Sequence, residues 1–167
     1  RGPAARAVVG SGAVRGRWAV AVGPGALFPV CRLLRGEPGL SFDLLLDVCG
    51  VDYLTRVERF DVVYHLYSLE SGHRIRLKVP VPESDPRVDS VTPIWRGANW
   101  FEREVYDLYG VRFRGHPDLR RILTHDGFGA HHPMRRDYPP GLRRHFERSA
   151  QVPIAEGCRA RDEPRFE

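Results

Sequence analysis

Four charged residues between Glu102 and Asp107 are the first group in the chain whose types and spacing could do chemistry. Glu102 and Glu104 flank Arg103, and two carboxylates beside a base could serve as a general acid and base. On a helix, however, side chains two residues apart point in different directions, whereas those four apart are neighbours. Arg103 and Asp107 have that second spacing. The pattern predicts charged contacts, and we assign no catalytic residue.

Histidines and cysteines are the second group, because both bind metals. The densest grouping among the seven histidines is His125, Asp126, His131 and His132. Adjacent histidines rarely build a tetrahedral site without supporting partners, and the chain has no HExxH, P-loop or GxGxxG motif. The three cysteines form no CxxC pair, which is typical of reduced thiols in a cytoplasmic setting. We expect no metal, iron–sulfur cluster or other cofactor bound by this chain.

A helix must position the run from Glu102 to Asp107. Asn99 can act as its N-cap with Glu102 at the third helical position, which predicts a capping box. Gly110 supplies a left-handed stop. Apolar side chains form one stripe of this helix: Trp100, Phe101, Val105 and Leu108. We predict that this stripe packs against a core and that the charged face is exposed.

Alternating apolar residues predict several strands upstream of this helix. The predicted strands cover residues 17–22, 42–48, 60–66 and 75–81, with a helix over 26–35 and a short edge strand at 111–113. Glu70-Ser71-Gly72-His73 is typical of a hairpin turn, so the strands beside it should pair in antiparallel fashion. The predicted fold class is α+β: a two-layer domain with a mostly antiparallel or mixed sheet covered by two helices, plus a long extended C-terminal tail.

Composition divides the chain into three segments. Residues 1–16 predict a flexible lead-in, residues 17–114 the α+β domain, and residues 115–167 an extended, Arg- and Pro-rich tail that we expect to wrap a partner. The net charge is +5, and Lys78 is the only lysine, so the positive charge is almost wholly arginine. Basic charge favours acidic partners. No apolar run approaches the roughly 20 residues that cross a bilayer, so at a membrane we expect something other than this chain to provide the anchor.

Two blocks of residues resemble a known family. The first runs through Glu102-Arg103-Glu104, Asp107-Leu108-Tyr109, His116, Arg120 and Ile122, and the second through Asp126-Gly127 and His132-Pro133-Met134-Arg135-Arg136-Asp137-Tyr138-Pro139. Both are similar to signatures of the 30 kDa subunit of respiratory complex I, which corresponds to the C subunit of the bacterial NADH-quinone oxidoreductase. The likeness extends back through Val51-Asp52-Tyr53 and Val63-Tyr64-His65-Leu66. The chain departs from the family at His131, Met134, Arg136 and Pro140, where Gly, Leu, Lys and Leu are more familiar.

The resemblance implies a non-catalytic structural subunit of the peripheral arm. Such a subunit supports the 49 kDa quinone-site subunit. In the complex, electrons pass from NADH to quinone through FMN and iron–sulfur clusters, which belong to partner subunits. This electron transfer is coupled to proton translocation. It implies a peripheral membrane protein at the cytoplasmic face of a bacterial cell membrane, with no nucleic acid as partner. The residues expected to bind the partner are Glu102, Arg103, Glu104, Asp107, His116, Arg120, Arg121, Arg135, Arg136, Asp137 and Tyr138.

Two alternatives stay open at this point. The same module serves membrane-bound hydrogenases, coenzyme F420 dehydrogenases and ferredoxin-dependent complexes of this superfamily. From a different class, an Arg-rich tail with aromatic residues is typical of a protein that orders on RNA, such as a ribosomal surface. Acidic residues interleaved with the arginines count against that second alternative.

Overall fold

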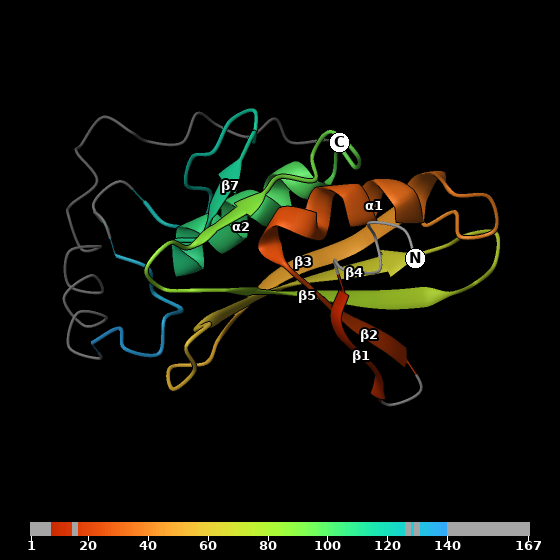
Figure 1. Ribbon diagram of the computed structural model, residues 1–167. Helices are drawn as coiled ribbons and strands as arrows, with labels where there is room; N and C mark the ends of the chain where they lie inside the picture. Colours follow the sequence, from red (N-terminus) through yellow and green to blue (C-terminus); the bar gives the residue numbers. More distant parts are fainter. Residues whose placement is uncertain (1–7, 15–16, 126–127, 129–130, 140–167) are drawn as a thin grey trace, which may run out of the picture.

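The computed structural model describes residues 8–14, 17–125, 128 and 131–139 (Figure 1). The expected tail from residue 140 onward, most of the expected lead-in and the Asp126-Gly127 pair lie outside the described residues. The predicted domain is present as a mixed sheet with two α-helices, which confirms the α+β class.

One sheet of five strands forms the base of the domain, in the order β1-β2-β5-β4-β3. The strands are β1 (Val8–Val14), β2 (Arg17–Val22), β3 (Leu44–Asp52), β4 (Phe60–Tyr67) and β5 (Arg74–Val81). All neighbours pair in antiparallel fashion except β2 and β5, which are parallel. The hairpin between β4 and β5 is the one that the turn at residues 70–73 predicts.

The central strands follow the alternation in their sequences. In β4 the side chains of Phe60, Val62, Tyr64 and Leu66 are buried, and in β5 those of Leu77, Val79 and Val81. Burying alternate apolar side chains on one face stabilises each strand by about 1.5–3 kcal/mol per large side chain. These residues make up the centre of the hydrophobic core.

Strand β3 differs from the prediction in its register. Leu44 and Leu46 are 40% and 42% exposed, whereas Leu45 and Val48 are buried. The pairing with β4 shifts between Leu45 and Asp47, as at a β-bulge. An inserted residue moves the following side chains to the other face. The apolar pattern that predicts a strand over residues 42–48 therefore does not mark the buried face of β3.

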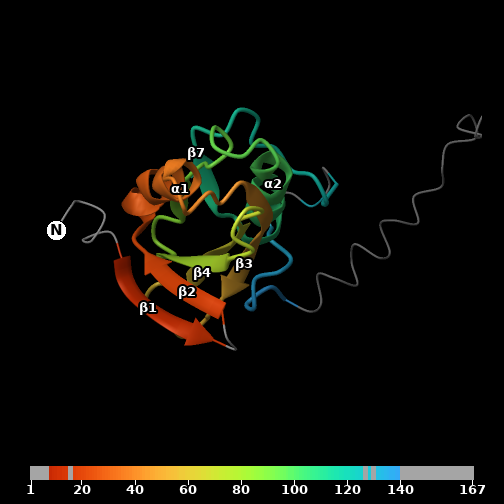
Figure 2. The ribbon, with the colours of Figure 1, turned by 90° about the vertical axis from the view of Figure 1, so that its right-hand side faces the viewer.

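Two helices cover one face of the sheet, as Figure 2 shows. After a short 3₁₀ turn, η2 (Pro24–Ala26), helix α1 (Leu27–Gly36) buries Leu27, Cys31 and Leu34. Helix α2 (Ala98–Tyr109) packs along β3. The strands β6 (Arg87–Asp89) and β7 (Arg112–Arg114) pair in parallel as a separate small sheet. The predicted edge strand at 111–113 corresponds to β7, and the sequence did not reveal β6.

Strand β1 lies where the sequence predicts a loosely ordered lead-in. Val8 and Val9 are 40% and 72% exposed, so core packing does not hold β1 in place. Its backbone instead pairs with β2 over most of its length. Composition alone missed this strand because ladder hydrogen bonds do not depend on side-chain type.

Candidate partner interface

Helix α2 begins differently from the predicted capping box. Its first residue is Ala98 and its N-cap is Gly97, which makes no side-chain cap hydrogen bond. Asn99 lies inside the helix, where its carbonyl oxygen is 3.2 Å from Nε2 of His116. Glu102 therefore does not reach back to the helix start. Trp100, which belongs to the predicted apolar stripe, is 66% exposed. The charged face of the helix, which was predicted to be exposed, is largely buried.

Glu102 is fully buried and holds the chain just before α2. Its carboxylate accepts hydrogen bonds from the hydroxyls of Ser90 (2.6 Å) and Thr92 (3.2 Å) and from the backbone N–H of Val91 (2.7 Å). Burial raises the pKa of Glu102 to about 7, although these three donors act in the opposite direction. Nε2 of His116 lies 3.9 Å from the same carboxylate.

Arg103 is also buried, and its guanidinium binds backbone carbonyls of the segment that follows β7. Nε donates to the carbonyl of Arg120 at 3.1 Å, and Nη2 donates to the carbonyl of Arg121 at 3.0 Å. A charged donor makes hydrogen bonds about twice as strong as neutral ones. Arg103 thus fixes the path of the returning chain.

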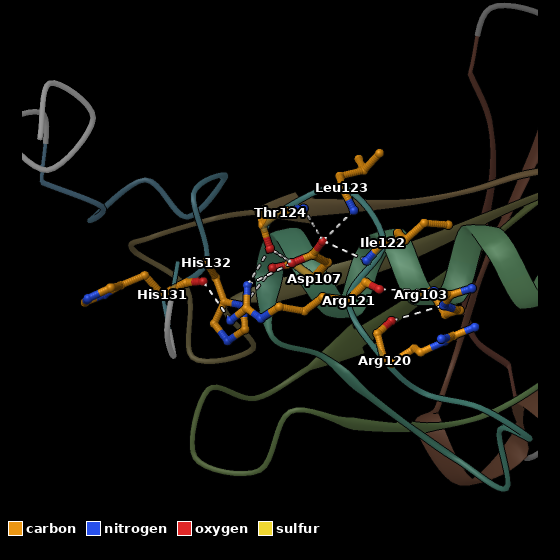
Figure 3. A network of polar contacts seen from close by, with 9 residues as sticks. All are labelled: Arg103, Asp107, Arg120, Arg121, Ile122, Leu123, Thr124, His131 and His132. Atoms are coloured by element: carbon orange, nitrogen blue, oxygen red, sulfur yellow. Dashed lines mark hydrogen bonds and ion pairs between the residues drawn. The ribbon is translucent and has the colours of Figure 1, made fainter. Parts of the chain in front are cut away.

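The carboxylate of Asp107 is the centre of the network in Figure 3. Its Oδ2 accepts the backbone N–H groups of Ile122 (3.1 Å), Leu123 (2.8 Å) and Thr124 (2.8 Å). Its Oδ1 accepts from Nη1 of Arg121 at 2.8 Å and from the Thr124 hydroxyl. Burial alone would raise the pKa of Asp107, but these donors lower it below its usual value. The carboxylate is therefore charged and serves as the anchor of residues 121–124.

These contacts engage Glu102, Arg103 and Asp107 within the chain itself, and the expectation that they bind a partner stays a prediction. Neither carboxylate has exposed surface on this chain, and each is bonded within it. The predicted helical pairing of Arg103 with Asp107 is replaced by Asp107 with Arg121. The physical reason is that a returning segment without regular structure has backbone groups that need buried partners.

The second signature block closes the C-terminal end of α2. Nδ1 of His132 lies 2.9 Å from the Asp107 carbonyl, and Nε of Arg135 donates to the Tyr109 carbonyl at 2.7 Å. The last carbonyls of a helix have no partner within it, and these side chains supply one. Gly110 turns the chain with φ of 79°, and a Cβ there would lie 2.5 Å from Nε2 of His132. Only glycine allows both the turn and this close approach.

Arg59 ties the same block to the sheet. Its guanidinium makes two 2.9 Å hydrogen bonds to Asp52 and contacts Glu83 at 2.6 Å and Asp137 at 2.7 Å. The backbone N–H of Arg136 also donates to Asp52 at 2.8 Å. Asp52 and Asp137 raise the pKa of Arg59, and Arg59 lowers that of Asp137. The sequence analysis missed Arg59, although Asp52 lies within a stretch that carries the family resemblance.

Tyr138 and Arg135 also face their own domain rather than solvent. Tyr138 is buried, and its ring stacks on Phe128 with centroids 6.3 Å apart. The guanidinium of Arg135 lies 5.0 Å from the centre of the Phe60 ring. Arg135 and Tyr138 therefore hold the second signature block against the chain's own sheet and helix, and partner contact by Arg135, Arg136, Asp137 and Tyr138 stays a prediction.

The remaining candidate residues differ in their exposure. Glu104, Arg120 and Arg136 are exposed, with Arg120 pairing with Asp118 at 2.9 Å. The side chain of His116 is enclosed. Contact of the exposed residues with a partner stays a prediction, because no partner chain tests it.

Among the residues that the structure describes, the group close enough to hold a metal is not the histidine grouping that the sequence analysis weighed. His132 is committed to the helix end, and the ring of His131 packs edge-on against Tyr138. Asp47, Cys49 and His65 instead bring a carboxylate, a thiol and an imidazole within 4.8 Å of one another. Arg76 pairs with His65 in the sheet, and its positive charge acts on the Cys49 thiol. Because that cation opposes a metal ion, we assign none to this cluster.

Comparison with known proteins identifies the family. The family model described as respiratory-chain NADH dehydrogenase, 30 Kd subunit, matches residues 20–144. The second NADH-quinone oxidoreductase C subunit of Rhizobium meliloti (strain 1021) is 50% identical over 133 residues, which are 80% of this chain and 72% of that protein. The C subunit from Roseiflexus castenholzii is 48% identical over 135 residues, 81% of this chain and 77% of that one. Against the C subunit from Xanthobacter autotrophicus, at 50% identity, the chain spans 63% of the relative's length and 80% of its own.

Solved structures agree with this result. The trypsin-resistant fragment (1-134) of Nqo5 is 39% identical with a TM-score of 0.60, and the match covers 69% of this chain and 92% of that one. A chain of the archaeal membrane-bound sulfane sulfur reductase has a TM-score of 0.69 at 23% identity, over 98% of this chain and 92% of that one, which shows a shared fold alone. From its sequence and its fold together, the chain belongs to the family of the 30 kDa subunit of respiratory-chain NADH dehydrogenase.

Proposed function

We propose that this chain is a non-catalytic structural subunit of the peripheral arm of an NADH-quinone oxidoreductase. In that assembly it supports a 49 kDa-type quinone-site subunit, and FMN and the iron–sulfur clusters belong to partner subunits. Electrons pass from NADH through those groups to quinone, coupled to proton translocation. The subunit sits at the cytoplasmic face of the cell membrane, and the names of its relatives favour this complex over the hydrogenase, F420 and ferredoxin alternatives.

This proposal rests on one observation: the buried carboxylates of α2 bind backbone segments of the chain itself. A catalytic acid or base must come within hydrogen-bond reach of a substrate. Glu102 and Asp107 have no exposed surface, and both carboxylates accept hydrogen bonds from backbone segments of the same chain. Their contacts fix a loop-rich surface rather than shape a reaction site, which supports a scaffolding role.

The surface fixed in this way is basic. Arg112, Arg120 and Arg136 are exposed on or beside the returning segment. Protein–protein association is steered by complementary charge. Among the described residues, no helix is long and apolar enough to cross a membrane, so the proposal places membrane attachment in other subunits.

An affinity pull-down of the tagged full chain from solubilised membranes of its own organism tests the proposal. We expect a quinone-site subunit, cluster-bearing subunits and NADH-oxidising subunits to co-purify, together with NADH:quinone reductase activity. Recovery of hydrogenase or F420-dependent partners would redirect the assignment within the superfamily. Recovery of ribosomal proteins or RNA alone would overturn it.

Two surface variants sharpen that test. Arg120→Glu and Arg136→Glu change exposed side chains and should leave the melting temperature of the isolated chain within about 2 °C, because surface changes are usually within 0.5 kcal/mol. If these residues meet a partner, co-purification should fall several-fold. Arg35→Glu, on the exposed side of α1, is the matched control and should assemble as the unchanged chain does.

A further inference from the structure

A cationic pocket of about 550 Å³ lies where the end of α2 meets β7 and the second signature block. Four arginines line it, together with His132 and one carboxylate: Arg87, Arg112, Arg121, Arg135 and Asp85. The lining therefore carries more positive than negative charge. A concave surface of one sign focuses the field and concentrates ligands of the opposite sign.

Two of the arginines form the rim of the pocket. Arg87 of β6 and Arg112 of β7 are direct register partners, which places like charges side by side. Such neighbours destabilise a sheet unless a counter-charge is present. Asp85 supplies one for Arg87 at 2.6 Å, whereas Arg112 is exposed and makes no ion pair with the residues that the structure describes. The rim therefore has a strongly basic side.

The other two arginines are held deeper and are already oriented. Arg121 is fastened to Asp107 at 2.8 Å, and Arg135 donates to the Tyr109 carbonyl while lying against Phe60. Groups that are fixed before binding lose little further entropy when a ligand arrives. Burial and the charges of Arg135 and Arg121 lower the pKa of His132, which leaves that ring neutral at the pocket wall.

We propose that this pocket receives an acidic segment of a neighbouring subunit, with two or more carboxylates along one stretch of chain. The inference rests on the proposed function, because it needs a subunit beside this one. Arg112 at the rim and Arg135 further in make no ion pair with the residues that the structure describes, and two such groups match successive carboxylates on a peptide better than a single small ion. Guanidinium groups also bind carboxylates through two parallel hydrogen bonds.

Site-specific photo-crosslinking in the assembled complex tests the pocket directly. Ser84 lines the pocket and is exposed, so Ser84→p-benzoylphenylalanine introduces the probe and leaves all four arginines in place. We expect irradiation of the purified complex to yield an adduct with another subunit. Mass spectrometry should map it to a peptide with at least two Asp or Glu residues near the attachment point. The same probe at Ser71, in the β4–β5 turn, is the control position.

Charge removal then shows whether the arginines cause that contact. The double variant Arg87→Gln/Arg112→Gln should reduce the Ser84 adduct at least fivefold, while Arg96→Gln, which changes an exposed arginine outside the pocket lining, should not. The proposal would be overturned by an adduct with a neutral or basic peptide, with phospholipid, or with residues 140–167 of the same chain. An unchanged adduct yield in the double variant would also overturn it. If the unchanged chain enters no complex, the proposed function itself fails. An assembled complex without an acidic adduct overturns the pocket alone.

Discussion

The guanidinium of Arg59 lies 2.7 Å from the carboxylate of Asp137, a residue 78 positions further along the chain. This contact joins the start of β4 to the second signature block. Asp52 completes the arrangement from the opposite strand, with two hydrogen bonds to the same guanidinium. The side chain of Arg59 is 4% exposed, whereas that of Asp137 is 48% exposed. The two partners are therefore expected to respond differently to mutation.

Arg59→Met should destabilise the domain by about 3–5 kcal/mol, because it leaves Asp52 buried without its cation. Asp137→Asn should cost about 1 kcal/mol or less, since a half-exposed partner in solvent contributes little. Urea unfolding followed by circular dichroism measures both changes. Arg120→Met is the matched control, because Arg120 is 72% exposed in its pair with Asp118. Equal losses in all three variants would contradict this account of the cluster.

Asp107→Asn should release the segment that the carboxylate anchors. An amide cannot accept every hydrogen bond that the carboxylate accepts, so at least one buried donor loses its partner, at about 1–3 kcal/mol each. Hydrogen exchange at the amides of Ile122, Leu123 and Thr124 should become at least tenfold faster, and trypsin should cleave after Arg120 and Arg121 sooner. Asp118→Asn removes an exposed carboxylate of the same segment and should change neither rate.

The stability of the domain should depend on the protonation of Glu102. Its folded pKa of about 7 exceeds its ordinary value of 4.5, so the folded state binds the proton more tightly than the unfolded state. The contribution of the protonated form is fully present below pH 4.5 and is lost as pH rises through 7. At about 1.4 kcal/mol per pKa unit, the loss is about 3 kcal/mol.

Glu102→Gln isolates this effect, because glutamine keeps the shape of the side chain and cannot ionise. Between pH 5 and pH 8 the free energy of unfolding of the unchanged chain should fall relative to that of the variant. The histidines titrate in both proteins, so the difference between the two curves reports Glu102. Parallel curves over this range would show that the carboxylate is already ionised at pH 5.

Gly50→Ala should disturb the packing of α2 on the sheet. A Cβ at this position would lie 2.5 Å from Cδ2 of Tyr109, which is too close for any real contact. Overpacking of this kind typically costs about 1–3 kcal/mol. Gly36→Ala, at the end of α1, meets nothing within 4 Å and should be neutral or slightly stabilising. In a double-mutant cycle, Tyr109→Ala should remove most of the cost of Gly50→Ala.

The regular elements were predictable where the side-chain pattern decides the structure. Strand β5 follows the predicted alternation, and β4 buries its predicted apolar face although Asp61 and Val63 on the other face are buried too. Helix α1 ends near its predicted boundary because Gly and Pro follow it. The prediction failed at β3, where a register shift breaks the alternation without a mark in the sequence. It also missed β6, in which Val88 lies between the charged residues Arg87 and Asp89.

The burial of the charged residues of α2 was not predictable from the sequence. A pattern-based prediction assigns charged residues of an amphipathic helix to solvent. Glu102 and Asp107 are buried because the donors that satisfy them come from Ser90–Thr92 and from residues 121–124, which meet α2 only after folding. Nothing local in the sequence marks these partners. In the structure these residues organise the chain itself, and their contact with a partner stays a prediction.

The late position of the second signature block has a consequence for synthesis of the subunit. A ribosome releases the chain from its N-terminus, so Asp52 and Arg59 emerge long before Asp137. Until residues 131–139 emerge, the end of α2 lacks the groups that bind its last carbonyls, and Arg59 lacks one of its counter-charges. The domain therefore reaches its final form only when translation has passed this block. A product that stopped before residue 131 would lack the docked block and would leave the last carbonyls of α2 without these partners.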